Sequence, residues 1–363
     1  MKIHVFNPEH DLALAHNGCH FTPPHAAREL RSDLGYIPAL WADDGDIVLV
    51  EDVKYAEKAA RRYRHQVANV LFVTADELRD ISKKLFPYTQ VSFSVWGWDM
   101  AVRQQFLDSG IPSQLLPDKA AIVHVRELSS RMTAVHLLPL LRELNGTVGA
   151  SMACCSADDL SVAIKEWGRV VLKAPWSSSG RGIKYVSSEL TPSQSGWFQR
   201  TIHHQGLVVA EAYNNKVLDF AMEFYAHPDG QVTYEGLSLF QTQNGAYTGN
   251  LLATEAEKMR RLNAWLPLDL VEGVKKRIVY YMSQQLKDVY DGPFGVDMMV
   301  VAKSDGDCFL LNPCVEINLR RTMGHVALSL TPTRMQPIRV MRVVHQTRYI
   351  LRSSPFKEDI IIK

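Results

Sequence analysis

The 363-residue chain has few cysteines and no long hydrophobic run. These two features argue against a disulfide-rich secreted protein and against a membrane-spanning protein. The cysteines are odd in number and have neither CxxC nor zinc-ligand spacing, so we expect free thiols in a reducing cytoplasm. No apolar run approaches the roughly 20 residues of a membrane span, and residues 1–6 lack the features of a signal peptide. We therefore expect a cytoplasmic protein with no membrane partner. The cysteines are Cys19, Cys154, Cys155, Cys308 and Cys314.

The sequence also lacks an excess of charge of either sign. Lysine and arginine total 40, aspartate and glutamate total 39, and the net charge of +1 gives no reason to expect a nucleic-acid partner. No internal repeat, Walker loop, GxGxxG motif or nucleophile elbow is present. With 46% hydrophobic and 22% charged residues, the composition is that of a globular protein long enough for two or three domains.

The first third of the chain alternates short β-branched runs with amphipathic stretches. We expect strands at residues 3–7, 37–41, 47–50 and 70–73, and helices at residues 53–63 and 99–109. This alternation is typical of a small parallel sheet covered by helices. Proline and glycine cluster near residues 111–113, which predicts an N-terminal α/β domain over residues 1–112.

Four polar residues, Asn7, Glu9, His10 and Asp11, follow the first expected strand. The carboxyl ends of parallel strands face the ligand crevice in open α/β sheets, so this segment could contact a polar substrate. It could equally be a capping turn in which Asp11 caps a helix beginning at Leu12. Both interpretations stay open at this stage.

Acidic and amide side chains near the C-terminal end predict a metal site. Glu316 and Asn318 alternate with apolar residues, so on a strand they face one side, and Asp297 could come from a neighbouring antiparallel strand. Two carboxylates and one amide oxygen suit Mg²⁺ carrying nucleotide phosphates. Arg320 follows on the same face and could stabilise a transferred phosphoryl group. The alternative is a hairpin with a solvated polar face.

A second segment predicts a phosphate site. Lys173 lies on a short apolar strand, and a loop of small residues follows it: Ser177, Ser178, Ser179, Gly180, Arg181 and Gly182. Small residues let backbone N–H groups approach an anion, and the lysine adds a charge. Another strand-like run follows, so the loop would be a flap between two strands, although such a loop is often only a hairpin turn.

A third segment lies between these two. Glu211 and Tyr213 end an apolar strand, and Asp219 lies on the next one. Glu211 could accept a hydrogen bond from an adenine amino group, and Asp219 could bind ribose hydroxyls. A hairpin with acidic ends is the alternative.

The order of these segments resembles the ATP-grasp superfamily over roughly residues 113–330. The matching stretches are VLKAPWSSSGRGI, VVAEAY followed by Asp219, FGVDMMV and VEINLRR. The resemblance implies that ATP contacts Lys173, the flap, Glu211, Ala212, Tyr213 and Asp219. It implies Mg²⁺, with Mn²⁺ as the alternative, on Asp297, Glu316 and Asn318. It also implies a basic residue near the start of an earlier helix, for which Arg131 is the candidate.

The resemblance further implies an α/β fold in which an ATP-grasp domain, residues 113–363, follows the N-terminal domain. Its first lobe, residues 113–206, would carry the flap, and its second, residues 207–363, the metal site. The implied enzyme is an ATP-dependent ligase that activates a small-molecule carboxylate for attack by an amine or other nucleophile. A small-molecule kinase and a nucleotide-binding module without turnover are the alternatives, and a homodimer is left open.

The roles of two kinds of residue that follow Asn318 in the chain stay open. Either Arg320 or Arg321 could be catalytic, depending on where the strand ends. His325 follows closely and could contact the substrate, although a buried structural histidine fits the pattern as well.

Overall fold

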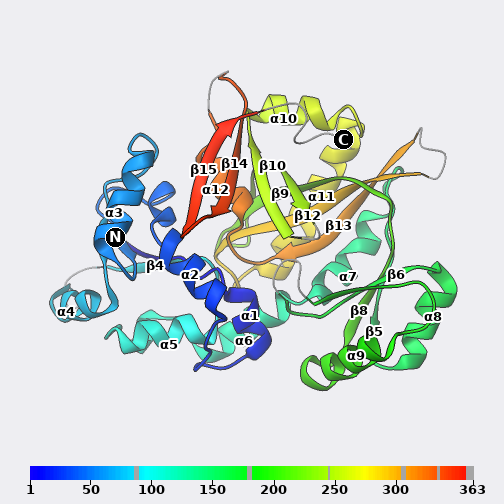
Figure 1. Cartoon of the computed structure of the whole chain (residues 1–363), viewed down its shortest axis with the longest axis horizontal. Coiled ribbons are helices and arrows are strands. Elements are labelled where there is room, and N and C mark those ends of the chain that lie inside the picture. The colour runs from blue at the N-terminus through cyan, green and yellow to red at the C-terminus, as the bar shows by residue number, and fades with distance from the viewer. Residues whose placement is uncertain (86–89, 178–181, 244–245, 304–307, 333–335, 357–363) are drawn as a thin grey trace.

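The computed structural model describes residues 1–85, 90–177, 182–243, 246–303, 308–332 and 336–356. Within these ranges the chain forms one parallel sheet followed by two antiparallel sheets, with helices packed against them (Figure 1). The α/β fold expected from the sequence, with a small parallel sheet in the N-terminal part, is confirmed, and the two later sheets are antiparallel. No helix in the described ranges is long and apolar enough to cross a membrane.

The N-terminal sheet has four strands in the order β3-β2-β1-β4, and all described pairs are parallel. The strands are β1 (Lys2–Val5), β2 (Ile47–Leu49), β3 (Leu71–Val73) and β4 (Ser92–Val95). The helices are α1 (His10–His16), α2 (His25–Leu34), α3 (Val53–Ala60), α4 (Ala75–Leu85) and α5 (Met100–Asp108), with short 3₁₀ turns η1 (Ile37–Leu40) and η2 (Arg61–Tyr63).

Two local predictions in this part are wrong. Residues 37–41 form no strand, because Pro38 lies in the first turn of η1 and offers no N–H to a strand ladder. The run is nevertheless buried, which explains its apolar pattern. Helix α1 begins at His10, so Asp11 lies in its first turn and is not its cap.

The middle sheet has the order β5-β8-β6-β7 and is antiparallel. Its strands are β5 (Ser151–Cys154), β6 (Val170–Lys173), β7 (Ile183–Val186) and β8 (Val208–Ala212). The helices of this region are η3 (Ser113–Leu115), α6 (Lys119–Leu128), α7 (Arg131–Leu141), α8 (Ala157–Trp167) and α9 (Pro192–Gln205). Because β6 pairs with β7, the expected flap joins two neighbouring strands.

The large sheet has seven strands in the order β13-β12-β9-β10-β11-β14-β15, each antiparallel to its neighbours. The strands are β9 (Lys216–Ala226), β10 (Val232–Gln243), β11 (Ala246–Leu252), β12 (Gly292–Ala302), β13 (Phe309–Asn318), β14 (Arg339–His345) and β15 (Tyr349–Pro355). Helices α10 (Glu255–Leu262), α11 (Leu268–Leu286) and α12 (Met323–Ser329) accompany it.

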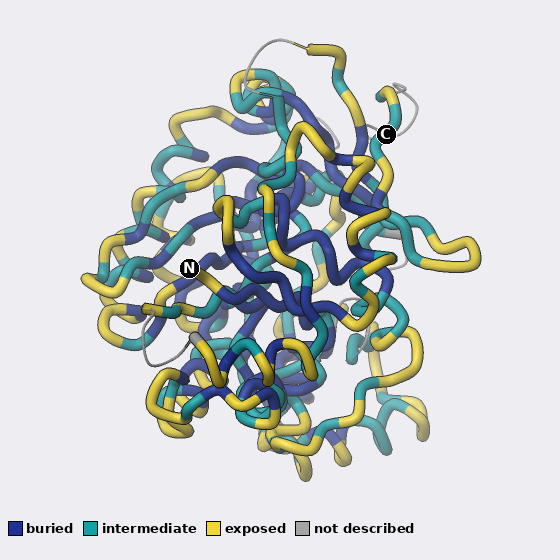
Figure 2. The backbone as a smooth tube through the Cα atoms, turned by 90° about the vertical axis from the view of Figure 1, so that its left-hand side faces the viewer, coloured by how far each residue is buried: buried dark blue, intermediate teal, exposed yellow. Residues whose placement is uncertain are grey.

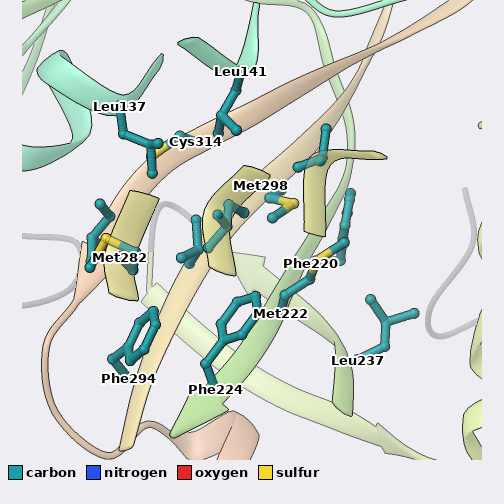
Figure 3. Close-up of a cluster of buried hydrophobic side chains, with 14 of the residues drawn as sticks. Leu137, Leu141, Phe220, Met222, Phe224, Leu237, Met282, Phe294, Met298 and Cys314 are labelled. Atoms are coloured by element: carbon teal, nitrogen blue, oxygen red, sulfur yellow. The ribbon is translucent and has the colours of Figure 1, made fainter. Parts of the chain in front are cut away.

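The two faces of this sheet have opposite characters, and β9 shows why. Phe220, Met222 and Phe224 alternate along β9 and enter a buried cluster with Phe294 of β12 and Leu137 of α7 (Figure 3). Burying one such side chain contributes about 1.5–3 kcal/mol. Since successive side chains point to opposite faces, Asp219, Ala221 and Glu223 face the other way. Because the apolar residues of β9 alternate with Asp219 and Glu223, the face of the strand opposite the buried cluster carries these two acidic side chains.

The last two strands pack against the N-terminal part of the chain (Figure 1). Met341 and Leu351 share a buried cluster with Phe6 and Trp96. The hydroxyl of Tyr63 donates to the backbone carbonyl of Leu351 at 2.7 Å. Buried strands run through the interior while exposed backbone lies at the periphery (Figure 2). The domain boundary at residue 112 remains a prediction, but contacts across it are extensive.

Candidate active site

A cavity of about 360 Å³ lies between the middle sheet and the polar face of the large sheet. The middle sheet contributes Lys173 and Glu211, and the large sheet contributes Asp219, Asp297 and Glu316. Residues from three separate sequence segments thus line one cavity.

Lys173 and Glu211 form a buried ion pair at the end of the cavity near β8. Their Nζ and Oε2 atoms are 2.7 Å apart, and both side chains are less than one-fifth exposed. The two residues come from the paired strands β6 and β8, whose antiparallel register brings them onto one face. A lysine that is held in place but still lines a cavity can bind an anionic ligand.

The predicted adenine and ribose residues lie beside this pair. Tyr213 follows β8; its backbone N–H donates to Arg169 at 2.9 Å, and the Arg169 guanidinium lies 3.7 Å from the ring centroid. Ala212 and Tyr213 both line the cavity. Asp219 accepts hydrogen bonds from Lys216 at 2.5 Å and Thr242 at 2.7 Å. The structure brings these residues together; their roles toward a nucleotide remain predictions.

The ends of the predicted flap are described, whereas Ser178, Ser179, Gly180 and Arg181 lie outside the described residues. Ser177 accepts a hydrogen bond from Arg131 at 2.9 Å. Gly182 has φ +67°, a conformation that favours glycine, and its carbonyl accepts from the Ala174 N–H at 3.0 Å. The loop is thereby closed at its base across the end of β6.

Arg131 links the flap to the large sheet. It opens α7, with Ser130 as the N-cap, and its side chain is 4% exposed. The guanidinium donates to the carbonyl of Ala174 and to Ser177, and it pairs with Glu316 at 2.7 Å. The basic residue predicted near a helix start is therefore present in the cavity wall, with its charge directed at the predicted metal ligands.

Asp297 and Glu316 lie opposite each other on the paired strands β12 and β13. Burial, with the neighbouring charge of Glu316, raises the pKa of Asp297 to about 7. Two close carboxylates that are only partly exposed favour a bound cation, which would offset their repulsion. Asn318 adds an amide oxygen, which accepts from Arg320 at 3.0 Å and keeps a second lone pair. These oxygen donors fit Mg²⁺ or Mn²⁺.

A site of this kind does not depend on a group of three or more histidine, cysteine, aspartate or glutamate side chains. The described ranges contain no such group arranged to hold a metal ion. The predicted set has only two carboxylates, and its third donor is an amide. The assignment to a metal stays a prediction.

The two arginines after β13 take different directions. Arg320 lines the cavity, and its guanidinium forms two hydrogen bonds with Asp11, at 2.8 and 2.7 Å. Arg321 packs over the Trp41 ring at 4.3 Å, its backbone N–H donates to Trp96 at 2.8 Å, and it does not line the cavity. Burial lowers the pKa of Arg321 to about 10. Of the two catalytic candidates, geometry favours Arg320.

The predicted substrate residues of the N-terminal segment are committed to internal contacts. Asn7 donates to the Gly97 carbonyl at 2.8 Å, and His10 lies 3.0 Å from Asp99. Glu9 pairs with Arg31 at 2.5 Å. Asp11 alone among the four contacts a residue of the cavity described above. Asn7, Glu9 and His10 thus anchor the segment to the start of α5 and to α2, and Asp11 reaches Arg320; their roles toward a substrate remain predictions.

His325 is buried and does not line the cavity. Its Nδ1 accepts from the Thr322 backbone N–H at 3.2 Å, and its Nε2 lies 3.2 Å from the Phe224 carbonyl. Burial lowers its pKa to about 3, so the ring is neutral. This arrangement fits the structural histidine and not the substrate contact that was also considered.

Glu223 is a cavity residue that the sequence patterns did not predict. It is 1% exposed and lines the cavity from β9, two positions beyond Ala221 and on the same face as Asp219. Burial, with the charge of Asp297, raises its pKa to about 8. The available signal was the alternation of Asp219 and Glu223 with Phe220, Met222 and Phe224.

No family model and no curated protein matches this sequence. Solved structures do match. They include N5-carboxyaminoimidazole synthetase from Staphylococcus aureus with ADP, at 16% identity and TM-score 0.48, covering 94% of this chain and 82% of that one. Biotin carboxylase from Campylobacter jejuni matches at 13% identity and TM-score 0.49, covering 94% and 74%.

Pyruvate carboxylase from Rhizobium etli matches at 14% identity and TM-score 0.51, covering 94% of this chain and 31% of that chain. At this identity the likeness concerns the fold alone. The chain therefore shares its fold with part of that protein, in keeping with the fold expected from the ATP-grasp resemblance.

Proposed function

We propose that the chain is an ATP- and Mg²⁺-dependent ligase of the ATP-grasp type. It would activate a small-molecule carboxylate as an acyl phosphate, which an amine or other nucleophile then attacks. The observation that carries the proposal is the opposition of Asp297 and Glu316 on β12 and β13, beside Arg320 and within the cavity that Lys173 and Arg131 also line. Oxygen donors of the large sheet and the basic side chains of β6 and α7 thus line the same cavity.

The residues divide into two groups by their place in the cavity. Lys173, Glu211, Tyr213 and Asp219 would hold the nucleotide, with Lys173 contacting phosphate oxygens. Asp297, Glu316 and Asn318 would hold Mg²⁺, which when bound neutralises charge on phosphate oxygens. The raised pKa of Asp297, about 7, supports a cation there, because a neighbouring positive charge would favour the ionised carboxylate.

The chemical work left to the protein is positioning and charge stabilisation. A substrate carboxylate oxygen attacks the γ-phosphorus, a new O–P bond forms, and the bond to the β-phosphate oxygen breaks, which releases ADP. Arg320 lies at the end of the metal-binding strand and would stabilise the charge on the transferred group.

Trapping with hydroxylamine tests this function. The purified full-length chain is incubated with ATP, MgCl₂, hydroxylamine and each of a panel of carboxylates that includes bicarbonate, and ADP and hydroxamate are measured. Phosphorylated product is analysed in parallel. ADP formation with an equal amount of hydroxamate for one carboxylate supports the ligase. A stable phosphorylated product insensitive to hydroxylamine would identify a kinase instead, and ATP binding without any ADP formation would identify a non-catalytic module.

A further inference from the structure

Two further cavities lie at the carboxyl ends of the N-terminal parallel strands. The smaller, about 360 Å³, is lined by residues that follow these strands: Phe6 after β1, Glu51 after β2 and Thr74 after β3. The larger, about 530 Å³, lies beside it and is also lined by α5. Ligands of open α/β sheets bind in the crevice outside the carboxyl ends of the strands, and both volumes are typical of small-molecule sites.

Helix α1 separates the larger cavity from the proposed ATP site. Glu9 and Ala13 line this cavity, whereas Asp11 lies on the opposite side of the helix and contacts Arg320. No described residue that lines the proposed ATP cavity also lines either of the two cavities near the N-terminal strands. A ligand bound here therefore leaves the nucleotide and metal sites free.

Three polar side chains line both cavities and mark the place where the cavities meet: Arg31 of α2, Gln105 of α5 and Glu51. Arg31 donates to Oε1 of Gln105 and to Oε1 of Glu9, and its side chain is 20% exposed, so further guanidinium N–H groups remain for a ligand. The amide N–H groups of Gln105 have no described acceptor. Glu51 is exposed and takes part in no described ion pair or side-chain hydrogen bond. The junction thus offers unused N–H donors and an unused carboxylate.

The remaining acidic side chains of the lining are hydrogen-bonded or ion-paired within the protein. Asp76 pairs with Arg79 at 3.0 Å, and Asp108 accepts a hydrogen bond from a side-chain amide at 2.8 Å. Asp99 is the N-cap of α5 and accepts from one of its backbone N–H groups. Among the described lining residues, Glu51 is therefore the carboxylate that is left for a ligand.

An amino acid complements these groups. Its carboxylate would accept hydrogen bonds from the Arg31 guanidinium and the Gln105 amide, and a charge-assisted bond to a guanidinium is a strong one. Its ammonium group would pair with Glu51, whose charge would otherwise repel a carboxylate bound nearby. A carboxylate without an ammonium group, or an amine without a carboxylate, would satisfy only part of the site.

We propose that Arg31, Gln105 and Glu51 form a second ligand site, which binds a zwitterionic amino acid and lowers turnover at the ATP site. The binding of the amino acid stands apart from the proposed function, whereas its effect on turnover rests on that function. No bond is made or broken at this site, because the amino acid acts by binding alone.

Glu9 connects the second site to Arg320. It is the N-cap residue of α1, its side chain is 6% exposed, and Arg31 lies 2.5 Å from it. A ligand carboxylate competes with Glu9 for the Arg31 guanidinium and so loosens the start of α1, where Asp11 orients Arg320. The two sites are thereby coupled, and the coupling acts in both directions.

Calorimetric titration of the full-length chain with single amino acids tests the site. Glycine and L-amino acids with acidic, basic, polar and apolar side chains are titrated, each beside its analogue without the amino group and its analogue without the carboxylate. One amino acid should bind, and both of its analogues should bind at least about 10-fold more weakly. As ADP with MgCl₂ is raised, the Kd of the amino acid should reach a plateau, whereas a ligand of the ATP cavity would be displaced in proportion to ADP.

Variants assign the binding to the three residues. Arg31→Gln should raise the Kd about 10- to 100-fold, because the charge-assisted bond to the carboxylate is lost. Glu51→Gln should bring the Kd of the amino acid close to that of its analogue without the amino group. Arg28→Gln, at an exposed arginine of the same helix, is the matched control and should leave the Kd unchanged. Gln105→Ala, with a smaller expected rise, replaces Arg31→Gln if that variant does not fold.

The hydroxamate assay separates this inference from the proposed function. The amino acid should lower the wild-type rate about fivefold or more and should leave the rate of Arg31→Gln unchanged at the same concentration. An unchanged wild-type rate overturns the effect on turnover. The site itself is overturned if no amino acid binds, if the wild type, Arg31→Gln and Glu51→Gln have equal Kd values, or if ADP displaces the ligand in proportion. Absence of hydroxamate with every carboxylate overturns the proposed function and the effect on turnover, and leaves the binding site standing.

Discussion

Arg320 and Asp11 form a two-point ion pair although they are 309 positions apart in the chain. Asp11 lies in the first turn of α1, and Arg320 follows the strand that carries Glu316 and Asn318. A carboxylate that binds both edges of a guanidinium fixes its orientation. The N-terminal part of the chain therefore positions the arginine that faces the predicted phosphoryl-transfer site.

Asp11→Asn should lower turnover without weakening nucleotide binding. The amide can accept only one of the two hydrogen bonds, so Arg320 loses its fixed orientation, and misplacement of such a group lowers kcat by about 10- to 100-fold. The hydroxamate rate measures turnover, and calorimetric titration with ADP measures binding. Asp80→Asn, at an exposed carboxylate of α4, is the matched control. An unchanged kcat in a folded Asp11→Asn variant would show that Arg320 needs no such partner.

Lys173→Ala should weaken ATP binding. The lysine is 8% exposed in the cavity wall, and its loss removes a charge-assisted contact to phosphate while leaving Glu211 without its partner. Calorimetry with a non-hydrolysable ATP analogue should give an increase in Kd of about 10- to 100-fold. Lys165→Ala, at an exposed lysine of α8, should leave Kd unchanged. Equal affinities for both variants would remove Lys173 from the phosphate site.

The polar face of the large sheet was only partly predictable from the sequence. Glu316 and Asn318 alternate with apolar residues within one strand, so their shared face follows from local geometry. The opposition of Asp297 to Glu316 follows from a short hairpin. The Asp11–Arg320 pair could not be predicted, because it depends on how two distant parts pack and no local pattern encodes it. The strand expected at residues 37–41 failed because burial alone does not distinguish a strand from a 3₁₀ turn containing Pro38.

Glu316→Gln should lower Mg²⁺-dependent turnover by at least about 100-fold, because it removes a metal-binding charge while keeping the side-chain shape. It also weakens the contact with Arg131, which is 2.7 Å long in the wild type. The hydroxamate rate is measured over a range of MgCl₂ and MnCl₂ concentrations, and the concentration for half-maximal rate should rise. Glu272→Gln, at a partly exposed glutamate of α11 that pairs with Lys275, is the control. Full activity of Glu316→Gln at the wild-type Mg²⁺ requirement contradicts the metal assignment.

Glu223→Gln should change how stability depends on pH in the ligand-free protein. Burial, with Asp297, raises the folded-state pKa of Glu223 from 4.5 to about 8, so the folded state holds the proton more tightly than the unfolded chain. The resulting stabilisation is fully present below about pH 4.5 and is lost as pH rises through about 8, and it is worth at most about 5 kcal/mol. Glutamine has no proton to lose. The melting temperature of the wild type minus that of Glu223→Gln should therefore fall between pH 5 and pH 9, as measured by differential scanning fluorimetry at each pH. Asp297 and His325 are present in both proteins, so only the part of their titration that is coupled to Glu223 remains in the difference. A difference that stays constant over this range would mean that Glu223 is ionised throughout, with a counter-charge that the described contacts do not contain.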